Sequence, residues 1–186
     1  MLSTLAPVPT VSAPTRLRLP DLLHTTDRAA DDVLSGRYDR LLRGLPEDDR
    51  WYTRLSGDDE LDVWLISWVP DKSTELHDHG GSLGALTVVS GSLRETRWDG
   101  EMLRQRRLSA GDQAAFPLGW VHDVVHAPDA TAVPVSGARP DVAGAPAPTV
   151  SVHAYSPPLT AMSYYEVTPQ NTLRRKRTEL TDAPEG

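Results

Sequence analysis

Two histidines separated by one residue, His77 and His79, are the strongest chemical feature of the sequence. Alternate side chains of an extended strand lie on one face, so this spacing turns both imidazoles the same way. A third histidine, His122, begins an apolar segment just after a turn that contains Pro117 and Gly119. Three neutral imidazoles can bind a divalent metal with open coordination positions, and zinc, iron, copper and nickel all accept them. The sequence therefore predicts a three-histidine metal site without choosing the metal.

A second polar series, Ser151, His153 and Tyr155, alternates with small apolar residues. On a strand these three side chains share one face. A buried polar series is tolerated when each member has a hydrogen-bond partner. We therefore expect a hydrogen-bonded Ser-His-Tyr series, with either a catalytic or a purely structural role.

Arg54 is a candidate for binding a substrate carboxylate. Its planar guanidinium can donate two parallel hydrogen bonds to a carboxylate, whereas a lysine offers only a point charge. Tyr52, two residues earlier, is expected to line the same pocket. The alternative is an exposed arginine without a ligand.

The overall composition fits one globular domain. The chain has 186 residues, of which 39% are hydrophobic and 24% charged. A net charge of −7 argues against nucleic acid as a partner, and no apolar run is long enough to span a membrane. The first ten residues lack the features of a secretion signal, so a cytoplasmic protein is expected. Nothing in the pattern implies a protein partner, and the absence of cysteine excludes disulfides and zinc-thiolate sites.

Short segments rich in β-branched and aromatic residues, separated by glycine-containing turns, dominate the middle of the chain. This pattern predicts a mainly β fold, either a β-sandwich or a jelly roll. The expected strands are Leu61–Val69, Leu83–Val89, Leu93–Trp98, Met102–Leu108, Gln113–Phe116, Val121–Val125 and Thr149–Tyr155.

The flanking regions differ from this β pattern. Residues 1–15 are rich in proline, serine and threonine and are expected to form a disordered tail before a single domain over 16–186. Apolar residues at helical spacing predict a first helix between Pro20 and Gly36 and a short second one over Tyr38–Arg43. Residues 127–148 contain five prolines and seven alanines, which predicts a flexible inserted loop.

The second histidine segment resembles a motif of the cupin family, G(x)5PxG(x)2H(x)3N. Gly111, Pro117, Gly119 and His122 fall in register with it, and His126 replaces the final asparagine. We expect His126 to support the metal site from outside the ligand set rather than to act as a fourth ligand.

The first histidine segment resembles the other cupin motif, HxH(x)3-4E(x)6G. Both histidines and Gly91 match, but Leu83 and Gly84 stand where the family carries an acidic ligand. The ligand set implied for this chain is therefore the three histidines alone.

The segment from Ser151 to Pro158 resembles the SxHxYSPP signature of the cysteine dioxygenases, iron-dependent thiol dioxygenases of the cupin superfamily. This resemblance implies a cupin jelly-roll β-barrel with Fe(II) at the three histidines. It also implies that the enzyme oxidises the thiol of L-cysteine with O2 to cysteine sulfinate. Ser151, His153 and Tyr155 would form a relay that places the phenol beside substrate and oxygen, and the Ser156–Pro157 bond would be cis.

The segment Tyr52–Arg54 resembles the part of these enzymes that supplies the carboxylate-binding arginine. Arginine at this position favours cysteine over 3-mercaptopropionate, whose dioxygenases carry glutamine there. Gly84 stands where animal members have a cysteine that crosslinks to the active tyrosine, so no crosslink can form here. Met162 stands where those enzymes often have a cysteine near the substrate.

Two alternatives to a cysteine dioxygenase remain open. The first is a dioxygenase of another small thiol, chiefly 3-mercaptopropionate. The second is a non-catalytic metal-binding cupin that senses or stores a small acid, in which Arg54 and the metal would serve binding only.

Overall fold

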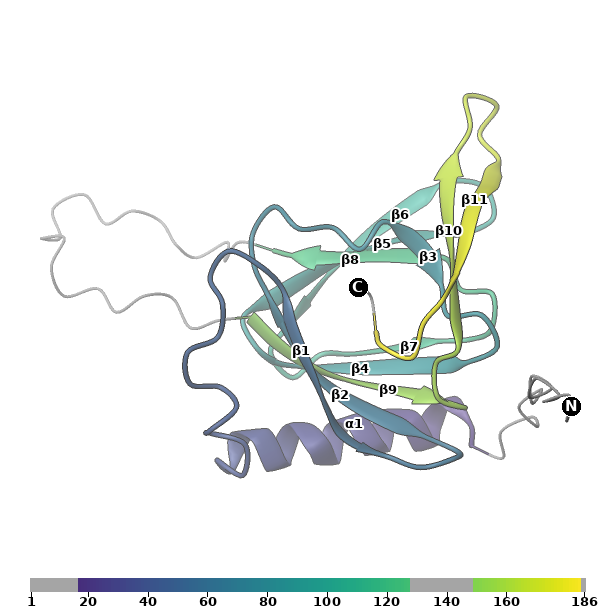
Figure 1. Cartoon of the computed structure of the whole chain (residues 1–186). Coiled ribbons are helices and arrows are strands. Elements are labelled where there is room, and N and C mark those ends of the chain that lie inside the picture. Colours follow the sequence, from purple (N-terminus) through teal and green to yellow (C-terminus); the bar gives the residue numbers. More distant parts are fainter. Residues whose placement is uncertain (1–16, 128–148, 185–186) are drawn as a thin grey trace, which may run out of the picture.

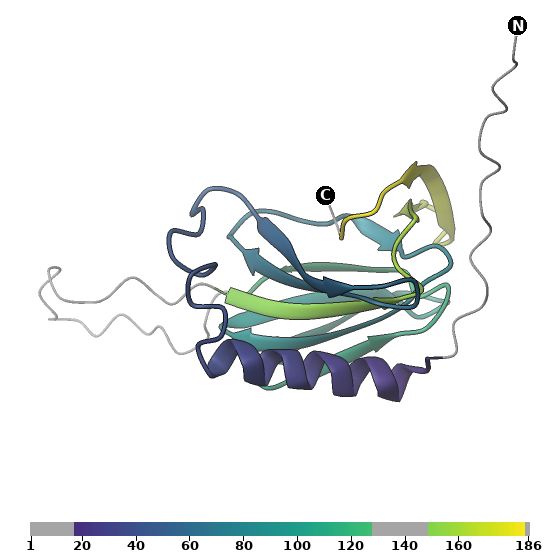
Figure 2. The ribbon, with the colours of Figure 1, turned by 60° about the horizontal axis from the view of Figure 1, so that its bottom comes forward.

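Two antiparallel sheets face each other in the computed structural model, which describes residues 17–127 and 149–184. A helix lies along the outside of one sheet (Figures 1 and 2). The predicted N-terminal tail lies outside the described residues, as does the predicted loop except for Ala127. The mainly β prediction is confirmed.

The five-stranded sheet carries the Ser-His-Tyr series. Its strands, in spatial order, are β1 (Trp51–Gly57), β2 (Asp62–Trp68), β9 (Thr149–Ser156), β4 (Leu83–Ser90) and β7 (Gln113–Phe116). The central position of β9 places its side chains away from either edge.

The six-stranded sheet carries the histidines. Its strands, in spatial order, are β11 (Leu173–Leu180), β10 (Ala161–Val167), β3 (Leu76–Asp78), β8 (His122–His126), β5 (Ser92–Trp98) and β6 (Leu103–Ser109). Here β3 and β8 are neighbours, so the two histidine segments meet although more than 40 residues separate them in the sequence.

Alternation along the strands creates two apolar clusters on opposite faces of the five-stranded sheet. On β2, Trp64, Ile66 and Trp68 face the interior between the sheets, whereas Val63 and Leu65 face the helix. All seven residues of β2 are therefore buried. The interior cluster forms the wall of the candidate site.

The helix α1 (Leu19–Leu34) packs on the outer face of this sheet. Its buried residues Leu22, Thr26, Ala30 and Val33 recur every three or four positions and form one face. The second predicted helix, over Tyr38–Arg43, is wrong, because this segment forms only turns. Gly36 and Gly44 bound it with positive φ angles of 86° and 75°, and the seven residues between them are too few for a stable helix.

Three strands, β1, β10 and β11, were not among the expected strands, and β3 was anticipated only through the extended spacing of His77 and His79. The clearest case is β11, whose basic run Arg174–Arg177 is an exposed strand edge. Arg177 stacks on Tyr164 at 3.8 Å and pairs with Glu75 at 2.8 Å. Arg177, the last residue of this run, is thus partnered by neighbouring side chains.

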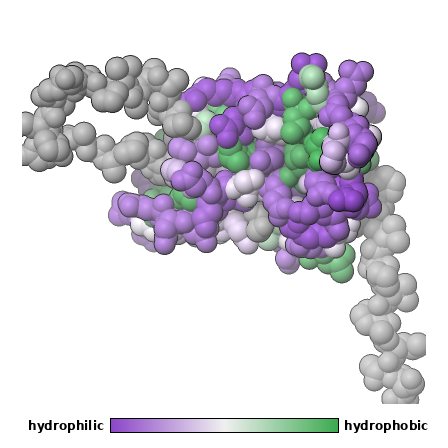
Figure 3. Space-filling view, turned by 90° about the horizontal axis from the view of Figure 1, so that it is seen from above, coloured by the Kyte–Doolittle hydropathy of each residue, from purple (hydrophilic) through white to green (hydrophobic). Residues whose placement is uncertain are grey.

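The molecular surface is predominantly hydrophilic in the view from above (Figure 3). Large exposed apolar side chains, such as Leu34, Met102 and Leu180, belong to different parts of the chain. Among the described residues no helix is both long and apolar enough to cross a membrane.

Candidate metal centre

The three histidines come together between the two sheets. His77 lies on β3, His79 directly follows this strand, and His122 is the first residue of β8. His77 and His122 are directly opposite each other in the β3–β8 pair. The candidate ligand atoms all lie within 4.8 Å of one another, and all three side chains are buried.

Hydrogen bonds at Nδ1 orient two of these rings. Nδ1 of His77 lies 2.9 Å from the Glu75 carbonyl oxygen, and Nδ1 of His122 lies 3.1 Å from Oε1 of Glu95. Both partners are acceptors, so Nδ1 is the protonated nitrogen and Nε2 carries the lone pair. Each ring therefore offers Nε2 as its ligand atom.

Asp78, between the first two histidines, fixes the turn that follows β3. Its carboxylate accepts hydrogen bonds from the Gly80 amide at 2.9 Å and from the Tyr165 hydroxyl at 2.6 Å. Gly80 has a positive φ of 59° and ends the extended segment. This turn is why His79 can join the group although it lies outside the strand.

Glu95 on β5 supports the site and was not predicted. Its side chain is fully buried, and besides His122 it binds the Trp120 indole N–H at 3.0 Å and the Arg106 guanidinium. Burial raises the pKa of Glu95, but the hydrogen bonds from His122 and Trp120 and the charge of Arg106 outweigh it and bring the pKa to about 2. A carboxylate behind a metal-binding histidine fixes its tautomer and raises its basicity.

This arrangement fits a divalent metal. It supplies three converging imidazole nitrogens in a buried site with oriented outer partners, as metal-binding histidines require. Imidazole suits iron, zinc, copper and nickel, so the donor set does not select among them.

The Ser-His-Tyr series on β9 is continuously hydrogen-bonded. Ser151 Oγ lies 2.9 Å from His153 Nε2, and His153 Nδ1 lies 3.1 Å from the Tyr155 hydroxyl. The Trp68 indole N–H donates to Ser151 Oγ at 2.8 Å. All three members are fully buried, so each polar group needs the partner it has.

Tyr155 connects this series to the histidines. Its ring centroid lies 4.9 Å from that of His79. Gly84 lies opposite Tyr155 on β4, and a Cβ at Gly84 would approach a Phe116 ring carbon at 2.9 Å and a Tyr155 ring carbon at 3.3 Å. The rings of Phe116 and Tyr155 thus occupy the space that a cysteine at this position would need.

Arg54 and Tyr52 lie on β1, on the interior side of the sheet. Arg54 is opposite Trp64 in the β1–β2 pair, with its guanidinium 6.0 Å from the indole ring. Tyr52 packs edge-on against the same indole at 6.0 Å. Both are exposed because β1 is the edge strand, so the structure places them at the rim of the interior.

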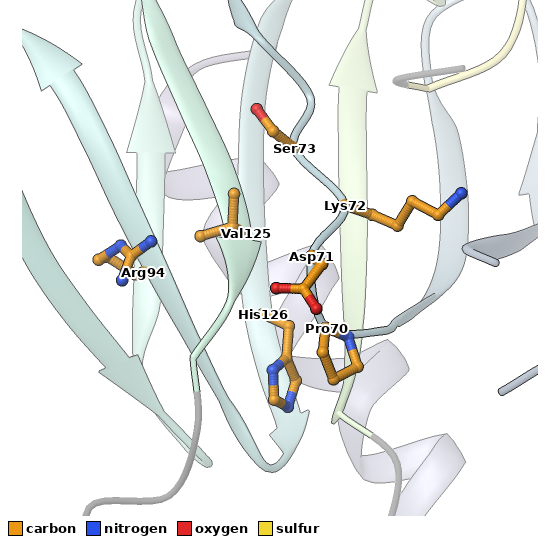
Figure 4. A pocket seen from close by; sticks show the side chains of 7 residues that line it. All are labelled: Pro70, Asp71, Lys72, Ser73, Arg94, Val125 and His126. Atoms are coloured by element: carbon orange, nitrogen blue, oxygen red, sulfur yellow. The ribbon is translucent and has the colours of Figure 1, made fainter. Parts of the chain in front are cut away.

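His126 lies elsewhere. It lines a hollow of about 420 Å³ together with Arg94, Val125 and the segment Pro70–Ser73, and the Lys72 side chain extends away from it (Figure 4). Four residues of extended strand put its Cα about 13 Å from that of His122. The supporting role expected for His126 at the metal site therefore has no structural basis.

A jelly-roll barrel with three inward-facing histidines defines a class of metal-binding β-barrel. The family model of cysteine dioxygenase type I matches residues 44–168, more than half of the chain. The chain belongs to the cysteine dioxygenase type I family. The Ser156–Pro157 peptide bond is cis, as the resemblance implied.

Solved structures of similar fold include other small β-barrels. A conserved protein with a double-stranded β-helix domain from Klebsiella pneumoniae subsp. pneumoniae is 17% identical, with a TM-score of 0.45, covering 74% of this chain and 91% of that one. A cupin superfamily protein from Desulfitobacterium hafniense is 12% identical, with a TM-score of 0.43, covering 60% and 80%. A sugar phosphate isomerase from a cupin superfamily, from Silicibacter pomeroyi, is 21% identical, with a TM-score of 0.47, covering 70% and 78%. At these scores the matches carry no inference about function.

Proposed function

We propose that this protein is a thiol dioxygenase that oxidises L-cysteine to cysteine sulfinate at an iron(II) site formed by His77, His79 and His122. In this reaction a thiol and O2 give a sulfinate and a proton. Sulfur is oxidised, O2 is reduced, and both oxygen atoms end on sulfur. Iron held by the three histidines would supply Lewis acidity toward a bound thiol and redox chemistry toward O2.

The observation that carries this proposal is the contact between the Ser-His-Tyr series and the three histidines. The Ser151-His153-Tyr155 series ends with the Tyr155 ring 4.9 Å from His79. A fully buried phenol oriented by an imidazole can position a substrate and hold or release a proton at its hydroxyl. This contact favours a catalytic role for the series over a purely structural one, because a structural series would not need to end beside the metal ligands.

Arg54 is proposed to bind the substrate carboxylate. It lies at the rim of the interior, two strands away from Tyr155, on the same side of the sheet. In this proposal Arg54 binds the outer end of a small molecule whose sulfur reaches the metal. Binding both ends converts the oxidation into an effectively intramolecular reaction.

The test is anaerobic reconstitution with Fe(II), followed by oxygen uptake with L-cysteine, 3-mercaptopropionate and cysteamine. We expect uptake to be fastest with L-cysteine, and with ¹⁸O2 both labelled atoms should appear in the sulfinate. Faster oxidation of 3-mercaptopropionate would reassign the substrate. No uptake with any thiol would leave a non-catalytic metal-binding barrel.

A further inference from the structure

Asp62, the first residue of β2, carries a buried carboxylate inside the barrel. The proposed reaction assigns it no role. Its side chain is 1% exposed. In the sheet it lies opposite Tyr155 on one side and opposite Gly57 on the other. Paired residues share a face, so Asp62 faces the same interior as the tyrosine proposed to act on the substrate.

The protein satisfies this carboxylate only in part. Burial raises the pKa of Asp62, against the opposing effects of the Trp64 indole, the Arg54 charge and the Leu159 amide. Oδ1 is buried and has no hydrogen-bond partner among the described residues. The Trp64 indole N–H, also buried and without an acceptor in hydrogen-bond geometry in the described structure, acts on this carboxylate without completing its hydrogen bonding. An incompletely satisfied buried carboxylate oxygen is costly, so a further donor would stabilise it.

Arg54 lies close to this carboxylate but does not neutralise it. A Cβ at Gly57, which is opposite Asp62, would lie 2.3 Å from Nη2 of Arg54, so the guanidinium rests directly on this glycine. The charge of Arg54 acts on Asp62, yet within the described part of the chain the two form no ion pair. The Arg54 guanidinium and the Asp62 carboxylate thus face the same interior without pairing directly in the described part of the chain.

We infer that Asp62 determines substrate specificity by accepting hydrogen bonds from the amino group of a thiol whose carboxylate is bound by Arg54. The inference rests on the proposed function and narrows its substrate to a thiol that carries both an amino and a carboxylate group. Such a molecule provides the donor that Oδ1 lacks and the acceptor that Arg54 can bind. Its amino nitrogen keeps N–H donors whether it is protonated or bound to a metal.

The order of the strands places Asp62 between the two ends of the proposed substrate site. Asp62 lies between β1, which carries Arg54, and β9, where Tyr155 contacts His79. An amino group at Asp62 therefore sits between the carboxylate site and the histidines. 3-Mercaptopropionate lacks the group that Asp62 would bind, and cysteamine lacks the group that Arg54 would bind.

The experiment is anaerobic titration calorimetry of the Fe(II)-reconstituted protein with L-cysteine, 3-mercaptopropionate and cysteamine. Asp62→Asn keeps the shape of the side chain and removes its charge. We expect it to weaken binding of L-cysteine and cysteamine roughly 10- to 100-fold, the range for a hydrogen bond to a charged group. Binding of 3-mercaptopropionate should change by no more than about twofold. Asp59→Asn, an exposed change in the same hairpin, should leave all three unchanged.

Three outcomes would overturn the inference. Equal losses for L-cysteine and 3-mercaptopropionate would show that Asp62 only positions Arg54. Unchanged binding of L-cysteine by Asp62→Asn would show that Asp62 has only a structural role. If the wild type bound L-cysteine no better than 3-mercaptopropionate, no site for an amino group would be needed. Asp62→Ser, which is neutral and smaller, should reproduce the same order of ligands if Asp62→Asn does not fold. Calorimetry without O2 measures binding separately from oxidation. If L-cysteine binds as expected here but is not oxidised in the oxygen-uptake assay, only the proposed function is contradicted.

Discussion

Glu95 and His122 form a fully buried carboxylate–imidazole pair, with Oε1 accepting a hydrogen bond from Nδ1 at 3.1 Å. In Glu95→Gln the amide oxygen can still accept this bond, but the negative charge that strengthens the imidazole as a ligand is lost. We predict that metal affinity falls roughly 10- to 100-fold. Competition with a chelator measures this, and Glu101→Gln, at an exposed residue, is the control. Unaltered metal affinity in Glu95→Gln would show that the pair serves only packing.

Tyr155→Phe tests the hydroxyl at the end of the buried series. The phenol is 3.1 Å from His153 Nδ1 and is proposed to position the substrate and handle its proton. We predict retention of iron and of the fold, with turnover reduced about 100- to 10,000-fold. Steady-state oxygen uptake gives the turnover. Tyr38→Phe, at a residue packed against the apolar cluster on the helix side of the five-stranded sheet, should leave the turnover unchanged. Normal oxidation of cysteine by Tyr155→Phe would remove the series from the mechanism.

Arg54→Ala should slow the oxidation of thiols that carry a carboxylate and have little effect on thiols that lack one. Arg54 is exposed, so its loss should cost less than breaking a buried ion pair, and we predict a fall of roughly 10- to 100-fold in kcat/KM for L-cysteine. Cysteamine should be a poor substrate of the wild type and lose little more, because it has no carboxylate to bind. Arg40→Ala, at another exposed arginine, controls for the change in net charge. Similar fractional losses for both thiols would mean that Arg54 supports the fold or the metal.

The raised pKa of Asp62 predicts a pH-dependent stability. The folded-state pKa lies above the ordinary value of 3.8, so between these two values the folded protein binds more protons than the unfolded chain. The free energy of unfolding therefore falls as pH rises through this window, and the penalty is complete above it. Asp62→Asn should be more stable than the wild type near pH 7, with a gap that narrows toward about pH 4. Urea unfolding at several pH values measures the gap, and a gap that widens in acid would contradict the assignment.

The predictable parts of the site are those with a local pattern. The HxH and SxHxY spacings rest on period-two alternation, which holds wherever the chain is extended. The strand that carries Ser151, His153 and Tyr155 was therefore predicted to within one residue of β9. His122 followed from its place after the Pro117–Gly119 turn.

Other parts depend on long-range pairing that no local pattern contains. Glu95 meets His122 only because β5 pairs with β8, and the two residues are 27 positions apart in the sequence. Asp62 begins a strand that is buried on both faces, so its apolar pattern does not tell which side looks inward. The exposed strand β11 lacks the apolar alternation that marks a half-buried strand, and β1 alternates over only three positions, Trp51, Thr53 and Leu55.

The most direct test of the central claim compares iron content and cysteine oxidation in the wild type and in His77→Ala, His79→Ala and His122→Ala. If these three residues hold the catalytic iron, the wild type should carry about one iron per chain, and each variant should lose both the metal and the activity. His24→Ala, at an exposed residue of α1, should keep both. Full iron content together with normal oxidation of cysteine in any of the three alanine variants would contradict the account.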